Sequence, residues 1–395
     1  MKISQRAQSI DPFFAMEFGK RAAALEAQGH HVIKLSLGEP DFGPPPAVLE
    51  AARAAVDGGA LPYTAALGIP ALREAIAGFY LREHGVTIAP NRIIVTAGAS
   101  AALLLVTAAL VDPGDEVIVG DPSYPCNRQF LSSFGAQVKL VQTDADSRFQ
   151  LSADSVRANW SAGTNGTKGL MIATPSNPTG TSVAPEELRA ICEWAREHDA
   201  WRIVDEIYLN LGDRDGAGHA PQTVLAHDDG AVVINSFSKY FGMTGWRLGW
   251  AVVPEEMVPT MERLAQNYYI CPSNVSQQAA LACFTPESLA ICEERRVEFA
   301  RRRELVLDGL AGIGLPVPVP PDGAFYVYFD VSGTGLTSWQ FCESALDEVH
   351  VALTPGKDFG HCGADRYVRL SYAASAGNLA EAIRRLGVLM DRLMK

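Results

Sequence analysis

Short apolar segments alternate with helical segments through the middle of the chain. Seven runs of four to seven residues, rich in valine, isoleucine and leucine, lie between residues 91 and 253, separated by helical patterns or turns. The runs are 92–96, 116–119, 137–141, 168–174, 201–204, 231–234 and 248–253. Such alternation is typical of an open, mainly parallel β-sheet with helices on both faces. The sequence therefore predicts a large three-layer α/β/α domain.

The end of the chain has a different pattern. A long charged helix is predicted at 287–310, followed by strands at 325–329, 351–353 and 367–370 and helices at 338–348 and 378–394. This order predicts a smaller α+β domain. We expect the N-terminal segment, with a helix from Pro12 to Gly29 and a strand at 32–37, to join it. The expected division is 1–46 for the N-terminal segment, 47–290 for the large domain and 291–395 for the small C-terminal domain.

Composition limits the partners that the chain can have. Its formal net charge is −12 over 395 residues, which argues against a general nucleic-acid binder or a protein that binds anionic membranes. The seven cysteines are scattered without C-x-x-C pairs, so we expect neither a disulfide framework nor a metal site. No apolar stretch is long enough to span a bilayer, and the N-terminus lacks a signal-peptide core. The expected location is the cytoplasm.

The segment 235–250 combines an amine with groups that bind anions. Ser236, Ser238 and Lys239 follow the apolar run at 231–234, and Arg247 comes after a glycine-rich turn. A lysine amine forms Schiff bases with carbonyl compounds, and serine hydroxyls with a guanidinium suit a phosphate. Pyridoxal 5′-phosphate carries both an aldehyde and a phosphate. Taken alone, the pattern is short, and a solvated surface lysine is the simpler interpretation.

Other segments offer further candidates for such a site. Gly98, Ala99 and Ser100 begin a predicted helix whose free amides suit a phosphate, although a tight packing turn explains them equally well. Asp205 ends a buried strand and needs a cation or hydrogen-bond donors. Tyr124 lies where a strand gives way to a helix, so its ring could stack on a flat ligand or serve only as packing.

Taken together, the motifs of the whole chain resemble the class I/II aminotransferases. These are fold type I pyridoxal-phosphate enzymes of the aspartate aminotransferase superfamily, and the resemblance extends in order over essentially the whole sequence. The motifs that carry it are Tyr63-x-x-x-x-Gly68, Ser-Asn-Pro-Thr-Gly at 176–180, Asp205-x-x-Tyr208, Ser236-x-Ser238-Lys239 with Arg247, and Arg369-Leu370-Ser371-Tyr372. The implied fold is a large α/β/α domain with a mainly parallel sheet and a smaller α+β domain.

The resemblance implies a role for each candidate residue. Lys239 would hold the cofactor as a Schiff base and then move the substrate proton. Asp205 would pair with the pyridinium nitrogen, and Tyr208 with Asn177 would hydrogen-bond the 3′-oxygen. Tyr124 would lie across the ring. The implied phosphate donors are Ser236, Ser238, Arg247, Gly98, Ala99 and Ser100 of one subunit, with Tyr63 reaching over from the neighbouring subunit of a homodimer.

The implied reaction is a ping-pong transfer of the amino group of an L-amino acid to a 2-oxo acid. Arg369 would clamp the substrate α-carboxylate, helped by Asn177 and the Gly38 amide. Some bacterial aspartate aminotransferases that resemble this chain carry a lysine for the side-chain carboxylate where Ser100 stands here. Apolar and aromatic donors therefore remain open. The alternatives are a pyridoxal-phosphate lyase or synthase and, from a different class, a ligand-binding regulatory module on the same fold.

Overall fold

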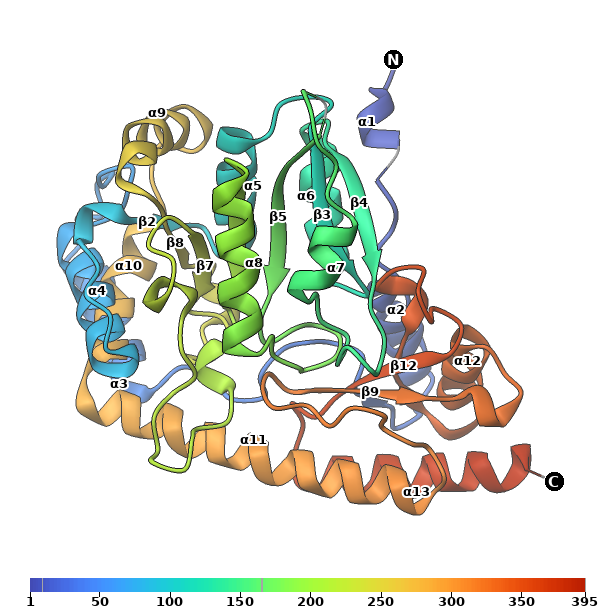
Figure 1. Cartoon of the computed structure of the whole chain (residues 1–395). Coiled ribbons are helices and arrows are strands. Elements are labelled where there is room, and N and C mark those ends of the chain that lie inside the picture. Colours follow the sequence, from blue (N-terminus) through green and yellow to red (C-terminus); the bar gives the residue numbers. More distant parts are fainter. Residues whose placement is uncertain (9, 165, 395) are drawn as a thin grey trace.

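The main sheet of the protein is mostly parallel. In the computed structural model, which describes residues 1–8, 10–164 and 166–394, the strand order is β2-β8-β7-β6-β5-β3-β4 (Figure 1). Only β8 runs antiparallel to its neighbours within this sheet. The bounds are β2 (Ile93–Thr96), β3 (Glu116–Asp121), β4 (Gln137–Gln142), β5 (Thr167–Ala173), β6 (Trp201–Asp205), β7 (Val232–Ser236) and β8 (Gly249–Val252). The predicted α/β architecture is confirmed.

Helices cover both faces of this sheet because successive strand residues point in opposite directions. Met171 packs in one apolar cluster with α5 (Ala99–Leu110), α6 (Pro125–Ser133) and α9 (Val258–Tyr268). Its neighbours Leu170 and Ile172 pack in another cluster, with α8 (Pro185–Glu197). Burial on both faces explains why the strands appear in the sequence as continuous apolar runs. The other helices beside this sheet are α3 (Pro46–Asp57), α4 (Pro70–His84), α7 (Ala153–Ala158) and α10 (Asn274–Ala280).

The C-terminal part builds a second, smaller sheet. Its antiparallel order is β11-β12-β9, with β9 (Tyr326–Asp330), β11 (Thr354–Pro355) and β12 (Tyr367–Ser371), and the helices beside it are α12 (Ser338–Val349) and α13 (Ala376–Leu393). The long helix α11 (Pro286–Gly312) runs beneath both sheets (Figure 1). It begins before residue 290 and ends well after it, so one continuous helix crosses the expected domain boundary.

The N-terminal segment packs on this smaller part. After α1 (Gln5–Gln8) and α2 (Phe14–Ala27), strand β1 (Ile33–Lys34) pairs in parallel with β10 (Val351–Ala352). The strand expected at 32–37 is therefore wrong in length. The Ser36 carbonyl accepts a hydrogen bond from Arg369 and the Gly38 carbonyl accepts one from Lys239, so side chains take the place of a strand partner there.

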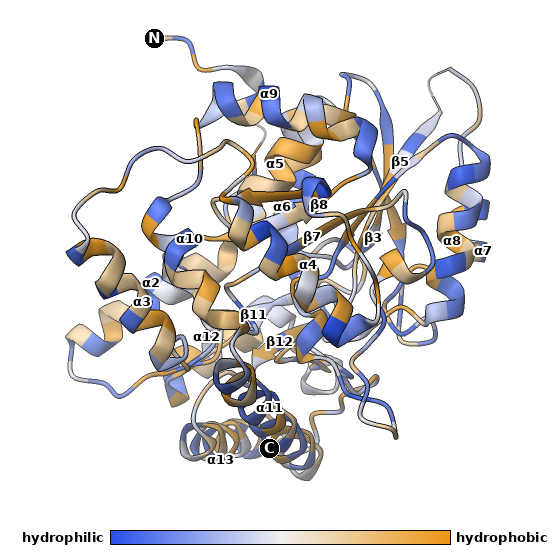
Figure 2. Cartoon of the chain, turned by 90° about the vertical axis from the view of Figure 1, so that its left-hand side faces the viewer, coloured by the Kyte–Doolittle hydropathy of each residue, from blue (hydrophilic) through white to orange (hydrophobic). Residues whose placement is uncertain are grey.

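Polar side chains gather on the outer faces of the helices. Figure 2 shows apolar strands β3 and β7 enclosed by helices, while α8 and α11 turn hydrophilic residues outward. None of the helices among the described residues is long and apolar enough to cross a membrane.

Candidate active site

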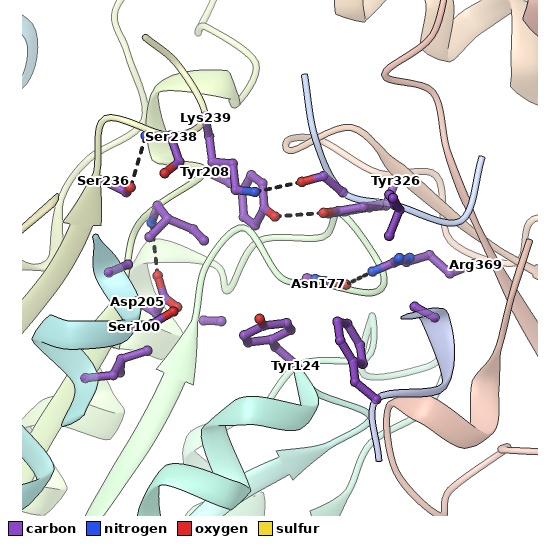
Figure 3. Close-up of a pocket in the computed structure, with 18 of the residues that line it drawn as sticks. Ser100, Tyr124, Asn177, Asp205, Tyr208, Ser236, Ser238, Lys239, Tyr326 and Arg369 are labelled. Atoms are coloured by element: carbon purple, nitrogen blue, oxygen red, sulfur yellow. Dashed lines mark hydrogen bonds between the residues drawn. The ribbon is translucent and has the colours of Figure 1, made fainter. Parts of the chain in front are cut away.

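A pocket of about 250 Å³ lies where the carboxyl ends of β5, β6 and β7 meet the smaller sheet and the N-terminal segment (Figure 3). Parallel strands bring their carboxyl ends to one edge of a sheet, which explains why residues far apart in the sequence converge here. Twelve of the residues singled out from the sequence line the pocket: Gly38, Ala99, Ser100, Tyr124, Asn177, Asp205, Tyr208, Ser236, Ser238, Lys239, Arg247 and Arg369.

Lys239 follows β7 and points its amine across the pocket. Its Nζ donates a hydrogen bond of 2.7 Å to the Gly38 carbonyl, a contact separate from the one predicted between the Gly38 amide and the substrate carboxylate. Desolvation lowers the pKa of Lys239 to about 8, assisted by the positive charges of Arg369 and Arg247 and opposed by Glu39 and Asp205. The fraction of neutral, nucleophilic amine near neutral pH is therefore much larger than for an ordinary lysine.

Asp205 is a buried carboxylate that faces the pocket from the end of β6. It is 4% exposed and accepts a 3.1 Å hydrogen bond from the Ile207 amide, and no described residue forms an ion pair with it. Burial raises the pKa of Asp205 to about 6, although the Ile207 bond and the charge of Lys239 oppose the shift. A buried acid that lacks a cation fits the protonated ring nitrogen of pyridoxal phosphate.

The phosphate-binding candidates gather at the start of α5. A Cβ built at Gly98 would lie 2.6 Å from Arg247 Nη2, and Gly98 has a φ of +86°, so only glycine allows this close approach. Ser236 Oγ accepts a 3.0 Å bond from the Ser238 amide. The amides of Ala99 and Ser100 at the start of α5 lack acceptors within the helix and suit an anion. This donor set fits the phosphate of the cofactor.

Arg369 lies on β12 at the opposite end of the pocket and is 1% exposed. Its Nη1 donates a 2.8 Å hydrogen bond to Asn177 Oδ1, and its Nη2 donates to the Ser36 carbonyl. Its Nε is buried and has no hydrogen-bond partner among the residues that the structure describes. The guanidinium is thus held in place by neighbours while it keeps capacity for a carboxylate.

Two of the site residues predicted from the sequence, Gly98 and Tyr63, do not line the pocket. Gly98 sits directly beside Arg247, as described above. Tyr63 is 79% exposed on the loop before α4 and does not reach the pocket of its own chain. Its predicted contact is with the neighbouring subunit.

The sequence interpretation missed several residues of the pocket. These are Phe13, Ala15, Ser36, Leu37, Leu103, Ala173, Ile207 and Tyr326. Most are apolar, and no local motif distinguishes them from ordinary core residues. Tyr326 is the most polar of the large ones, and its hydroxyl lies 2.8 Å from the Tyr208 hydroxyl. Within the part of the chain that the structure describes, no group of three or more His, Cys, Asp or Glu side chains could hold a metal ion.

Comparison with known proteins agrees with this geometry. Residues 30–386 match the family model for aminotransferase class I and II. The valine–pyruvate aminotransferase of Mycobacterium tuberculosis is 41% identical over 96% of this chain and 96% of its own length, and the aspartate/prephenate aminotransferase of Thermus thermophilus is 37% identical over 99% of each.

Solved structures show the same fold. A crystal structure of an aminotransferase from Mycobacterium tuberculosis superposes with a TM-score of 0.93 at 40% identity, covering 99% of this chain and all of that one. The aspartate aminotransferase of Thermus thermophilus with maleate gives 0.91 at 36% identity, covering 98% of this chain. Aminotransferase names among these relatives favour amino-group transfer over the lyase and regulatory alternatives. The chain belongs to the class I and II aminotransferases, enzymes that use pyridoxal phosphate to move an amino group from an amino acid to a 2-oxo acid.

Proposed function

We propose that Lys239 is the Schiff-base and proton-transfer residue of this aminotransferase and that its amino donors have uncharged, apolar side chains. The observation that carries the first part is the convergence of the Lys239 amine, the unpaired Asp205 carboxylate and the donors around Arg247 on one pocket. An amine, an acid and a phosphate site are the three features that pyridoxal phosphate requires.

The residue roles follow from the chemistry of each group. When bound, pyridoxal phosphate supplies an aldehyde for amines and a ring that withdraws electrons from the substrate Cα. Lys239 Nζ, with its lowered pKa, accepts the Cα proton and later returns it. Asp205 holds a proton on the ring nitrogen, and Tyr208 and Asn177 donate to the 3′-oxygen. Tyr124 lines the pocket and would lie against the ring.

The phosphate is held by hydroxyls, a guanidinium and free amides. The donors are Ser236, Ser238, Arg247 and the start of α5 at Gly98, Ala99 and Ser100. Arg369 binds the substrate α-carboxylate together with Asn177, and it thereby orients the Cα–H bond toward the Lys239 amine. Correct alignment favours proton loss over loss of the carboxylate.

The lining of the pocket supports apolar donors. Its cations are Lys239, Arg247 and Arg369, and each already has a partner in the assignment above. A second carboxylate on the substrate would find no further cation among the lining residues, and Ser100 stands where some aspartate aminotransferases have a lysine. The other side chains that line the pocket are mostly apolar, namely those of Phe13, Ala15, Leu37, Leu103, Ala173 and Ile207. The relative from Mycobacterium tuberculosis is named for valine and pyruvate.

A panel of amino donors tests the substrate class. With pyruvate as acceptor, we expect valine, leucine or alanine to give a kcat/KM at least tenfold above that of aspartate or glutamate, since an unpaired buried charge is costly. Replacing Ser100 by lysine should raise the kcat/KM for aspartate and so reduce the difference between the two classes of donor. A wild-type preference for aspartate would overturn the proposed class, while amino-group transfer itself would stand.

Covalent trapping tests the role of Lys239. Treatment of the holoenzyme with borohydride should abolish its near-visible absorbance and leave the cofactor attached to the peptide that contains Lys239. The Lys239→Ala variant should show no trapped adduct. An adduct mapped to another lysine would contradict the assignment.

We also propose that the enzyme is a cytoplasmic homodimer. Each chain would be divided at about residues 46 and 290 into an N-terminal segment, a large domain and a small C-terminal domain. Support for the dimer comes from a group of exposed large apolar side chains: Leu61, Tyr63, Tyr268 and Ile270. Their two segments touch, because Asn274 Nδ2 donates a 2.7 Å hydrogen bond to the Pro62 carbonyl. An apolar patch of this kind is typical of a surface that another subunit covers.

A further inference from the structure

Tyr326 enters the pocket from the smaller sheet. It begins β9, pairs with Ser371 of β12 and is 1% exposed. Figure 3 shows its side chain between Tyr208 and Arg369. It therefore stands between a residue assigned to the cofactor and a residue assigned to the substrate, although no motif pointed to it.

The hydroxyl of Tyr326 has one partner. It lies 2.8 Å from the Tyr208 hydroxyl, which is its only hydrogen-bond partner within the described part of the chain. On its other side, a Cβ built at Gly38 would overlap the Tyr326 hydroxyl, so the glycine backbone packs directly against it. The Gly38 carbonyl is already engaged by Lys239.

The direction of this hydrogen bond matters. Burial raises the pKa of both phenols, so each hydroxyl keeps its single proton in the neutral range. If Tyr208 donated to Tyr326, the Tyr326 proton would be buried without an acceptor, which is costly. If Tyr326 donates to Tyr208, the Tyr208 proton is free to point into the pocket. The second arrangement leaves no buried donor unsatisfied once the pocket is filled.

The ring of Tyr326 has a second contact. The Arg369 guanidinium carbon lies 4.6 Å from the centre of the Tyr326 ring and 4.8 Å from that of Phe359. Cation–π contacts of this length hold a guanidinium in place without using its N–H donors. The donors of Arg369 thus remain available for Asn177 and for a carboxylate.

We propose that Tyr326 is a positioning residue that serves both ends of the site: its hydroxyl donates to Tyr208 and directs the Tyr208 proton toward the cofactor 3′-oxygen, while its ring holds Arg369 for the α-carboxylate. This inference rests on the roles proposed above for Tyr208 and Arg369.

The hydroxyl and the ring can be tested separately. Tyr326→Phe removes the hydroxyl and keeps the ring, so we expect the pH midpoint of the near-visible absorbance of the holoenzyme to rise by roughly half to one pH unit. The KM for the amino donor should stay within about twofold of wild type. Tyr326→Leu removes both contacts, and its KM should rise about tenfold, as expected for a lost cation–π contact.

A double-mutant cycle shows whether Tyr326 acts through Tyr208. Tyr208→Phe should raise the same midpoint, and Tyr208→Phe/Tyr326→Phe should raise it no further than Tyr208→Phe alone. Shifts that add in the double variant would overturn the proposal, because Tyr326 would then act by another route. The proposal would also be overturned if Tyr208→Phe shifted the midpoint and Tyr326→Phe left it unchanged. If Tyr208→Phe leaves the midpoint unchanged, the assigned role of Tyr208 fails and the proposal fails with it.

Tyr328→Phe is the matched control. Tyr328 lies two residues further along β9, its buried hydroxyl has no hydrogen-bond partner among the described residues, and it does not line the pocket. Loss of the Tyr328 hydroxyl should leave both the pH midpoint of the near-visible absorbance and the KM for the amino donor unchanged. Thermal unfolding of each variant checks that the fold is retained, and Tyr326→Phe carries the test if Tyr326→Leu does not fold.

Discussion

At the scale of single residues, the site without its cofactor holds ionisable groups in unfavourable surroundings. Burial lowers the pKa of Lys239 to about 8 and raises that of Asp205 to about 6. Both shifts favour the neutral form, because burial removes water from each charge and neither group has an ion-pair partner among the described residues. A cofactor that reacts with the amine and offers a cation to the acid relieves both costs, so its binding should stabilise the fold strongly.

The pKa of Asp205 predicts how the stability of the apoenzyme depends on pH. The folded pKa of about 6 lies above the ordinary 3.8, so the ionised carboxylate destabilises the fold above pH 6, and this cost disappears below about pH 4. The difference corresponds to roughly 3 kcal/mol. Asp205→Asn cannot ionise, and in the apo form it should exceed the wild type in free energy of unfolding by about that amount near pH 7.5 but by little near pH 4. Urea denaturation at the two pH values measures this.

Asp330 provides a control of opposite sign. Although burial opposes the shift, hydrogen bonds from Arg366 and Ser332 lower the pKa of Asp330 below its ordinary value. The ionised form of Asp330 therefore stabilises the fold above the unfolded pKa, and Asp330→Asn should lose stability near pH 7.5 and not at low pH. An Asp205→Asn effect of equal size at both pH values would show that packing, and not ionisation, is responsible.

Sequence reasoning worked best for residues that end strands of the main sheet. Asp205 ends β6 and Lys239 follows the neighbouring parallel strand β7, so the two residues lie at the same edge of the sheet and their convergence could be anticipated. Tyr326 could not be anticipated in the same way. It begins a strand of the other sheet, and its approach to Tyr208 depends on how the two sheets are placed relative to each other, which no local pattern encodes.

At the scale of elements, the Asp358 carboxylate of the smaller part of the molecule holds the start of helix α2. Asp358 accepts hydrogen bonds of 2.9 Å from the Phe14 amide and 3.1 Å from the Ala15 amide at the start of the helix. These amides lack acceptors within the helix, and the positive end of the helix dipole favours the anion. Because Phe13 and Ala15 line the pocket, Asp358 holds part of its apolar wall in place.

Removing the Asp358 carboxylate should loosen the apolar wall of the pocket at Phe13 and Ala15 without changing how the cofactor is bound. We expect Asp358→Ala to lose about 1–3 kcal/mol of stability, because the buried Ala15 amide and the half-buried Phe14 amide lose their acceptor. The KM for an apolar donor should rise several-fold, while the pH midpoint of the cofactor absorbance stays as in wild type. Limited proteolysis should cleave the first twenty residues faster. Asp347→Ala is the control, since Asp347 contacts the same helix only through an exposed ion pair with Arg21. Equal effects of both substitutions would contradict the role of Asp358.

The short first strand shows where element prediction fails. The apolar alternation of residues 32–37 indicated a six-residue strand, but β1 ends at Lys34. Beyond it the backbone carbonyls of Ser36 and Gly38 accept hydrogen bonds from Arg369 and Lys239. Hydrogen bonding to side chains that are more than 200 residues away cannot be recognised from a local pattern, so the strand was predicted too long.

At the scale of the whole molecule, a shared site predicts complementation between two inactive variants. If Tyr63 serves the neighbouring pocket, a mixed dimer of Tyr63→Ala and Lys239→Ala chains has one pocket with both residues intact and one with neither. Random reassembly of equal amounts should then restore about one quarter of the wild-type sites. Activity after denaturation and refolding of the mixture measures this. Recovery no greater than the sum of the separately refolded variants would show that Tyr63 does not cross between subunits.

The pairing of β1 with β10 has a consequence for synthesis of the protein. Ile33 leaves the ribosome early, yet its strand partner Val351 follows more than 300 residues later. Lys239 and the proposed phosphate donors are all translated before residue 250, whereas β10, which pairs with the N-terminal segment, and Arg369 are made only after residue 350. A chain that ended before that point would contain Lys239 and the proposed phosphate donors but would lack Arg369, the residue proposed to orient the amino acid.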